Sequence, residues 1–299
     1  MIKPIALEIF SPVQSINDPL FDEKGLEVFI KRDDLIHPLI SGNKWRKLKY
    51  TLIKARNEHK NHLVTFGGAF SNHLLATSAA AAQFGFKSTG FVRGEEVTND
   101  MLFLCRLHGM ELIFTDRERY RDKQALFDQL FGHDPNAFFV DEGGASEEGV
   151  KGCEELVAEL KENYDHILCA CGTGTTAAGI IRGLIEHQVN ATLHAIPVLR
   201  NGHFIGDEIK HHLKQDANFE LHTEYHFGGY AKTTPELINF IKHFVAATGI
   251  LIDPVYTGKM LFALYDLAQK DFFKSGQRIL AIHTGGVWGL MGMKNKFFK

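Results

Sequence analysis

The chain is poor in cysteine, with four residues in 299, and these are scattered along the sequence. Only Cys169 and Cys171 lie close together, in an apolar segment that we expect to be a buried strand. This spacing favours neither a disulfide framework nor a zinc site, and the sixteen histidines show no paired spacing with Cys or Glu that resembles a metal site. We therefore expect a reducing cytoplasm as the compartment and no bound metal.

The sequence also lacks an excess of charge, since its formal net charge is −3. Without a strongly basic face, nucleic acid is not an expected partner. No apolar run reaches membrane-spanning length, and the N-terminus lacks the apolar core of a signal peptide, so we expect neither a membrane partner nor a secretory leader. At 44% hydrophobic and 23% charged residues, the composition is typical of a globular protein with a sizeable core.

Short apolar segments alternate with helical patterns along most of the chain, which predicts an α/β fold with largely parallel sheets. The first 29 residues contain three prolines and predict loop with short extended pieces. Further on, residues 221–227 predict a strand and residues 234–245 a helix with Pro235 at its first position. There is no internal repeat, low-complexity linker or break in composition.

A helix is predicted to begin near Lys44, because apolar residues recur at helical spacing after it and Ser41 and Asn43 are able to cap it. The positive end of the helix dipole disfavours a cation there, so the Lys44 amine should lose its proton easily, as a nucleophilic lysine must. The alternative is a solvated lysine in a basic patch, because Lys47 and Lys49 follow closely.

Four turns between predicted strands and helices carry small or hydroxylic residues, at the edge where parallel sheets bind ligands. Residues 172–176 (Gly-Thr-Gly-Thr-Thr) suit a phosphate, but lack the P-loop Gly-Lys-Ser/Thr and the three-glycine dinucleotide spacing. The other turns are residues 71–73 (Ser-Asn-His), 253–259 (Asp-Pro-Val-Tyr-Thr-Gly-Lys) and 283–286 (His-Thr-Gly-Gly). Each could instead be a plain turn or helix cap, and a Ser71–His73 catalytic pair is disfavoured because such neighbours do not face each other on a helix.

One ligand would use all these features, because it combines a phosphate, an aldehyde that a lysine can capture, and an aromatic ring. That ligand is pyridoxal 5′-phosphate, which serves as an electron sink for a carbanion next to an amine.

The chain resembles the pyridoxal-phosphate enzymes of fold type II, the tryptophan synthase β type. Within them it is similar to the D-cysteine desulfhydrase and 1-aminocyclopropane-1-carboxylate deaminase family. The resemblance extends from residue 31 to residue 286 and rests on the Ser-Gly-Asn-Lys, Ser-Asn-His and Asp-Pro-Val-Tyr-Thr-Gly-Lys motifs.

The resemblance implies a role for each motif. Lys44 would form the Schiff base, and Asn72 would contact the ring oxygen. Four residues would hold the phosphate: Thr173, Gly174, Thr175 and Thr176. On the substrate side the resemblance places Ser71, Asn72, His73, Tyr230 and Tyr256, with Ser71 and the two tyrosines beside the carboxylate and the α-proton.

The resemblance also implies two lobes, with residues 1–47 and 154–299 forming the large lobe and residues 48–153 the small lobe. The cofactor would lie in the cleft between them, and a homodimer acting on a small amino acid is expected.

Two positions bear on the reaction. The deaminase pattern has glutamate at position 257 and leucine at position 284, where this chain has Thr257 and Thr284. A neutral threonine near the pyridine nitrogen supplies a hydrogen bond without charge, which suits elimination of a good leaving group. His73, where the deaminase pattern has glutamine, points the same way.

We therefore expect D-cysteine to be converted to pyruvate, sulfide and ammonia, with Lys44 or Tyr256 moving the α-proton. Deamination of 1-aminocyclopropane-1-carboxylate, elimination from or racemisation of another amino acid, and a non-catalytic pyridoxal-phosphate-binding protein are the alternatives. A nucleotide-binding module is disfavoured by the absent P-loop lysine.

Overall fold

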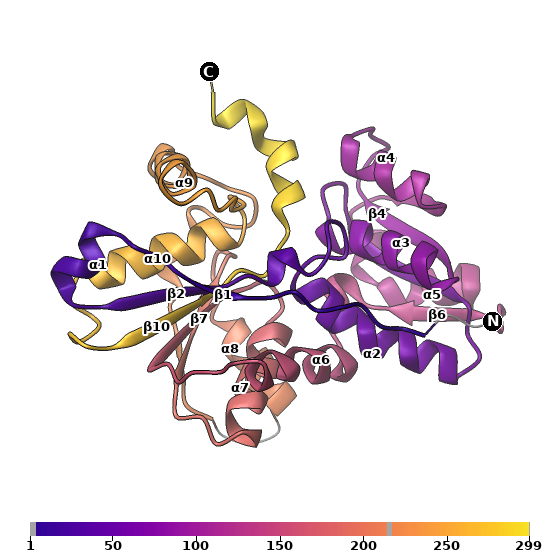
Figure 1. Cartoon of the computed structure of the whole chain (residues 1–299). Coiled ribbons are helices and arrows are strands. Elements are labelled where there is room, and N and C mark those ends of the chain that lie inside the picture. The colour runs from indigo at the N-terminus through magenta and orange to yellow at the C-terminus, as the bar shows by residue number, and fades with distance from the viewer. Residues whose placement is uncertain (1–3, 214–216, 299) are drawn as a thin grey trace.

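The computed structural model describes residues 4–213 and 217–298 and contains two separate sheets (Figure 1). The larger sheet has the strand order β1 (Val13–Ser15), β2 (Glu27–Lys31), β10 (Arg278–Ile282), β7 (His166–Cys171), β8 (Thr192–Pro197) and β9 (Phe219–Leu221). Its neighbours pair in parallel except β1 and β2, which are antiparallel. Strands from both ends of the chain therefore build one sheet, with β10 between β2 and β7.

The smaller sheet, on the right of Figure 1, is parallel throughout. Its order is β5 (Met110–Thr115), β4 (Lys87–Arg93), β3 (His62–Gly68) and β6 (Ala137–Val140). The α/β fold with parallel-rich sheets is thus confirmed. The division into lobes at residues 48 and 153 stays a prediction, because strand order shows which strands belong together and not where a lobe ends.

The helices connect and cover these sheets. They are α1 (Pro19–Lys24), α2 (Asn43–Asn57), α3 (Asn72–Phe84), α4 (Asp100–Leu107), α5 (Lys123–Phe131), α6 (Glu147–Ala158), α7 (Thr175–Glu186), α8 (Phe204–Leu213), α9 (Pro235–Thr248) and α10 (Thr257–Gln269). Short 3₁₀ segments include η3 (Glu142–Gly144), η4 (Glu224–His226) and η5 (Val287–Lys296). No helix within residues 4–213 and 217–298 is both long and apolar enough to cross a membrane.

The alternation of side chains along β10 shows how the large sheet is buried on both faces. Ile279 and Ala281 join the apolar cluster that contains residues of α9 and α10, whereas Leu280 and Ile282 join the cluster that contains residues of α6, α7 and α8. A strand covered on both faces needs apolar residues at every position, which explains its uninterrupted Ile-Leu-Ala-Ile run.

Two sequence-based assignments are wrong. Residues 19–24 form helix α1 and not a loop, because the Asp18 side chain accepts a hydrogen bond from the Leu20 N–H and Pro19 occupies the first turn. The strand predicted at residues 221–227 ends at Leu221. The chain then turns through η4, and Phe227 adopts a left-handed conformation with φ of 51°. Tyr225 and Phe227 therefore reach the apolar core from a turn and not from a strand.

Candidate active site

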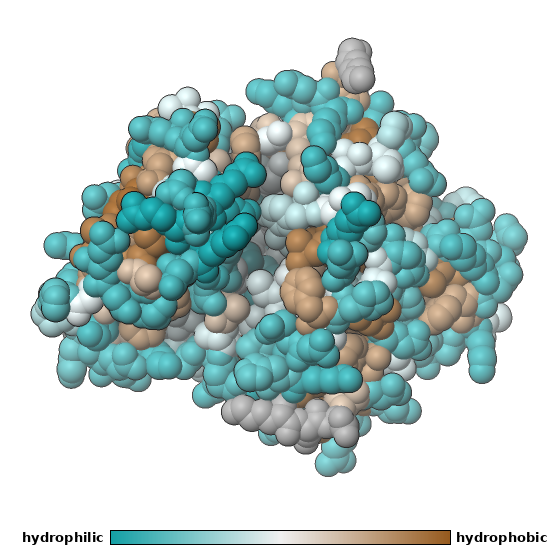
Figure 2. All heavy atoms as spheres, turned by 180° about the vertical axis from the view of Figure 1, so that it is seen from behind, coloured by the Kyte–Doolittle hydropathy of each residue, from teal (hydrophilic) through white to brown (hydrophobic). Residues whose placement is uncertain are grey.

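A cavity of about 520 Å³ lies where strands of both sheets end. Its wall contains Gly68 from β3, Arg93 from β4 and Cys171 from β7, each at or near the carboxyl end of its strand. The space-filling view shows a hollow between the two halves of the molecule (Figure 2). The volume is within the range of small-molecule and cofactor sites, and the edge is the one at which parallel sheets bind ligands.

Lys44 is the second residue of helix α2 and reaches this cavity. Gly42 directly precedes the helix, its φ of 60° suits glycine, and a Cβ there would lie 2.0 Å from the Thr284 carbonyl oxygen. No side chain caps the helix, so the capping expected of Ser41 or Asn43 is wrong; the Asn43 N–H donates to the Thr284 carbonyl instead, at 3.2 Å. The start of α2 is thereby tied to the end of β10.

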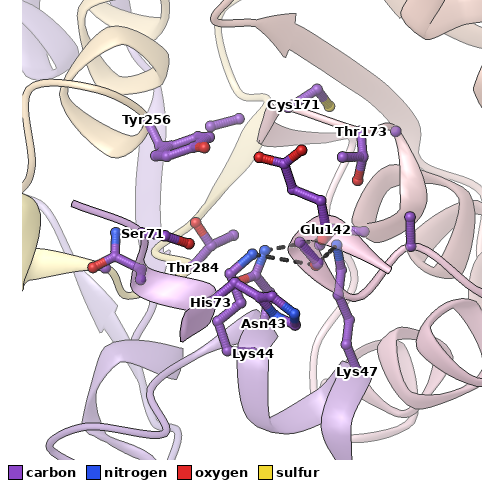
Figure 3. Close-up of a pocket in the computed structure, with 18 of the residues that line it drawn as sticks. Asn43, Lys44, Lys47, Ser71, His73, Glu142, Cys171, Thr173, Tyr256 and Thr284 are labelled. Atoms are coloured by element: carbon purple, nitrogen blue, oxygen red, sulfur yellow. Dashed lines mark hydrogen bonds between the residues drawn. The ribbon is translucent and has the colours of Figure 1, made fainter. Parts of the chain in front are cut away.

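The Lys44 amine has a pKa lowered to about 7, first because burial disfavours the charged form and then because the Lys47 ammonium repels it. Lys44 and Lys47 both point to the carbonyl oxygen of Gly143, with Nζ–O distances of 3.4 and 3.2 Å (Figure 3). Sequence analysis treated Lys47 only as part of a basic patch. Its spacing of three residues from Lys44 on a helix was the available signal.

The turn of residues 172–176 leads from β7 into α7. Gly174 adopts a φ of 74°, the Thr173 and Thr175 hydroxyls are 3.0 Å apart, and the Asn43 amide donates to the Thr176 hydroxyl at 3.0 Å. Thr173, Gly174 and Thr176 belong to the cavity wall, whereas Thr175 is fully buried and lies outside it.

His73 is a buried, neutral member of the wall. The Thr65 hydroxyl donates to the Val140 carbonyl at 2.9 Å, so it accepts at 2.8 Å from His73 Nε2, which must carry the proton. Burial, followed by repulsion from Lys44 and Lys47, holds the His73 pKa well below its usual value. Ser71 caps α3 through the Leu74 N–H at 3.3 Å, and both Ser71 and Asn72 also line the cavity.

Tyr230, Tyr256 and Thr284 lie in the wall as expected, but Thr257 does not. The two tyrosine rings meet edge to face with centroids 6.1 Å apart, and burial, followed by the neighbouring Tyr230, raises the pKa of Tyr256. Thr257 is fully buried, and its hydroxyl donates to the Asp253 carboxylate at 2.7 Å. The structure therefore brings only Thr284 of the two threonines to the cavity.

Four charged residues that the motifs did not indicate come from the part of the chain that forms the small sheet and its helices. Arg93, Lys123, Asp141 and Glu142 all line the cavity. In Figure 3 the Glu142 carboxylate points inward, with Ser71 and Tyr256 on one side and Thr173 on the other. Asp141 and Glu142 directly follow β6, so their place after a parallel strand was a usable signal.

A family model described as pyridoxal-phosphate dependent enzyme matches residues 11–285. The chain belongs to this family. It shares the fold of a solved homologue of 1-aminocyclopropane-1-carboxylate deaminase, with a TM-score of 0.88 and 31% identity over 99% of this chain and 94% of that one.

Curated relatives within the family carry the names of two activities. A Thermotoga maritima protein, provisionally named a 1-aminocyclopropane-1-carboxylate deaminase, is 31% identical, and the match covers 96% of each chain. The Arabidopsis thaliana bifunctional D-cysteine desulfhydrase/1-aminocyclopropane-1-carboxylate deaminase is also 31% identical, covering 89% of this chain and 74% of its own. The resemblance to fold type II enzymes and the pyridoxal-phosphate cofactor are thus confirmed, and the chain is an enzyme of that family.

The cavity fits this cofactor. His73 Nδ1 is buried and has no hydrogen-bond partner among the residues that the structure describes. Because the ring proton is on Nε2, Nδ1 is an acceptor for which the described part of the protein supplies no donor. At Gly172 a Cβ would come within 3.2 Å of the Tyr256 ring, so glycine leaves space that a larger residue would fill. The wall also combines a poorly protonated lysine with a hydroxyl-rich helix start, the groups that an aldehyde and a phosphate require.

Proposed function

We propose that this enzyme eliminates a β-substituent from a small D-amino acid, with D-cysteine converted to pyruvate, sulfide and ammonia. The observation that carries the proposal is the weakly basic Lys44 facing a cavity lined by hydroxyl groups. Ser71 and Tyr256 lie on one side and Thr173 on the other (Figure 3), and Thr284 and Thr176 also belong to the wall. Pyridoxal phosphate, when bound, supplies the electron sink that makes an α-proton removable.

The residues would divide the work as follows. Thr173, Gly174 and Thr176 would hold the phosphate at the start of α7, and Lys47 of α2 adds a cation to the same cavity wall. Lys44 would anchor the cofactor and, once released by the substrate, take the α-proton, because a pKa of about 7 leaves much of it neutral.

Tyr256 is better suited to donate a proton than to accept one. Its raised pKa keeps the phenol protonated at neutral pH. Ser71 and Tyr230 would bind the substrate carboxylate beside it. Lys259 supports this side, since its buried Nζ donates to the Gly229 carbonyl at 2.8 Å, next to Tyr230.

Deamination of 1-aminocyclopropane-1-carboxylate is the second candidate, because relatives carry that name. We favour elimination because Thr284, the position at which the deaminase pattern has leucine, brings a neutral hydroxyl to the cavity wall. A hydroxyl can donate to the pyridine nitrogen without supplying a charge, which is sufficient when a thiolate leaves. The homodimer remains an expectation from the resemblance, and the cytoplasmic location an expectation from the scattered cysteines.

The test is to incubate purified holoenzyme separately with D-cysteine, L-cysteine and 1-aminocyclopropane-1-carboxylate. We expect the near-visible absorbance of the bound cofactor to change with D-cysteine and equal amounts of sulfide, ammonia and pyruvate to appear. A four-carbon oxo acid and ammonia from the cyclopropane substrate, without sulfide from D-cysteine, would replace elimination by deamination. A Lys44→Ala variant should lose about 10³-fold or more in turnover with either substrate.

A further inference from the structure

Three histidines form a row across one face of the large sheet, away from the cavity. His166 begins β7, His194 lies in β8 and His222 directly follows β9. His194 Nε2 is 2.9 Å from His166 Nδ1, and His194 Nδ1 is 2.9 Å from His222 Nε2. The cavity lies at the opposite end of β7, beyond Cys171, roughly 16 Å away at the usual rise per strand residue.

Glu220 completes a triangle with two of these rings. Its Oε2 lies 3.8 Å from His194 Nδ1 and 3.8 Å from His222 Nε2, the same two nitrogens that are 2.9 Å apart. A point equidistant from the three atoms is therefore about 2.1 Å from each, which matches zinc–nitrogen and zinc–oxygen bond lengths. We propose that His194, His222 and Glu220 bind a divalent transition-metal ion of the zinc type.

The surroundings suit such an ion. His194 is completely buried, which favours the neutral imidazole, the form that binds a metal ion. Glu220 is half-exposed and Glu224 Oε1 lies 3.9 Å from His222 Nδ1, so two carboxylates balance the charge of a dication. Two imidazoles favour a late transition metal over magnesium or calcium.

The outer contacts also agree with metal binding. With the ion on His194 Nδ1, the remaining proton of that ring sits on Nε2 and donates to His166 Nδ1, an arrangement typical of metal-binding histidines. Phe272 packs edge-on against His194 and His222, with ring centroids 5.6 and 5.7 Å away, and shields them from water. The partly exposed Glu220 side leaves a path for the ion and a fourth, solvent ligand.

Sequence spacing conceals this arrangement. His194 in β8 is the cross-strand partner of Glu220 in β9. His222 directly follows β9, two residues after Glu220, and its side chain is therefore on the same face. The expectation of no metal considered neighbours along the chain, whereas these ligands meet across strands. An ion here would link the edge strand β9 to its neighbour β8. The chain continues from β9 through η4 to Tyr230, which lines the cavity.

The test is titration of tag-free holoenzyme with Co²⁺, whose d–d absorption reports tetrahedral nitrogen and oxygen ligands. We expect saturation at one ion per chain, displacement by one equivalent of Zn²⁺, and a higher unfolding temperature with Zn²⁺. Glu220→Gln, at a half-exposed position, and His222→Gln should each weaken binding about 100-fold or more, and Glu224→Gln about 10-fold.

The matched control is the double variant His211→Gln/His212→Gln, which removes two histidines from α8 without touching the triangle. It should bind Co²⁺ like the unaltered protein. Absence of tetrahedral bands in the unaltered holoenzyme, or bands that persist in Glu220→Gln and His222→Gln, would overturn the proposal. Sulfide release and cofactor absorbance are separate readouts, so failure of the metal site leaves the proposed function untouched.

Discussion

Lys44 and Lys47 share one acceptor, the carbonyl oxygen of Gly143, at 3.4 and 3.2 Å. After burial, which is the larger cause, the charge on Lys47 lowers the pKa of the Lys44 amine further. Lys47 therefore has two effects on the site: it lowers the pKa of the Lys44 amine, and it lines the cavity itself.

Replacing Lys47 by methionine should raise the pKa of Lys44, by about one unit from its value of about 7, because a like charge is removed. Only the neutral amine attacks an aldehyde, so the rate rises as pH increases through this pKa. The measurement is the pH profile of cofactor-free protein reacting with pyridoxal, which has no phosphate for Lys47 to bind.

Lys49→Met is the control for that experiment. Lys49 lies on the same helix as Lys47, and its ammonium group pairs with Glu155 at 2.6 Å. Its profile should keep a midpoint near 7. Identical profiles for Lys47→Met and the unaltered protein would show that Lys47 does not control Lys44.

Thr284 and Thr257 should differ in their effect on catalysis. Thr284→Val removes a hydroxyl from the cavity wall, and we expect turnover of D-cysteine to fall about 10- to 100-fold with little change in stability. Thr257→Val instead removes a hydrogen bond to buried Asp253, which should cost about 1–2 kcal/mol of unfolding free energy and leave turnover nearly unchanged. Steady-state kinetics and urea unfolding of both variants test this, and a larger catalytic loss in Thr257→Val would reverse the assignment.

Thr65 and Thr77 form a second matched pair, both fully buried. Thr65→Val leaves the His73 Nε2 proton without its acceptor, and should cost about 1–3 kcal/mol of unfolding free energy. The Thr77 hydroxyl has no partner within the described part of the chain, so Thr77→Val should be neutral or stabilising. Urea unfolding measures both, and equal losses would mean that side-chain shape, not the hydrogen bond, matters at Thr65.

Arg46 holds a buried carboxylate in place. Its guanidinium donates to both oxygens of Asp33, at 2.5 and 2.7 Å, and both groups are almost completely buried. Arg46→Met should cost about 3–5 kcal/mol at neutral pH, because Asp33 would keep a buried charge with too little compensation. Arg182→Met, which removes more exposed pairs with Glu147 and Glu154, should cost about 1 kcal/mol or less.

The same pair gives a pH dependence with a definite sign. Burial alone would raise the pKa of Asp33, but attraction and hydrogen bonding to Arg46 lower it below 3.8 in the folded protein. The contribution of the pair is therefore present above pH 3.8 and is lost as pH falls through the folded-state value. The stability difference between the unaltered protein and Arg46→Met, measured by urea unfolding, should shrink on acidification, and a difference that grows would contradict this account.

Sequence patterns were sufficient where one strong local signal decided the structure. Apolar runs located β3, β4, β7 and β10, and the hydroxyl-rich turns after strands located part of the cavity wall. Position in a motif did not reveal side-chain direction. Thr257 follows Tyr256 directly, yet the capping carboxylate of Asp253 turns its hydroxyl away from the cavity.

Features that depend on distant segments were out of reach. The places of Glu142 and Arg93 at strand ends are a local signal, but they share a cavity with residues of the large sheet only because the two sheets face each other, and no spacing along the chain encodes that approach. Helix α1 was a different failure, since Asp18, Pro19 and Gly25 are a readable start and stop signal that the count of prolines obscured.

The position of β10 between β2 and β7 has a consequence for how the protein is made. A chain emerging from the ribosome can complete the parallel sheet of β3 to β6 early, because those strands are near in sequence. The Lys44 helix cannot dock on Thr284 until the chain has been synthesised at least to that residue, about 240 residues after the helix begins. Cofactor capture must therefore come late, because a chain stalled before residue 278 would lack the enclosure that buries Lys44 and lowers the pKa of its amine.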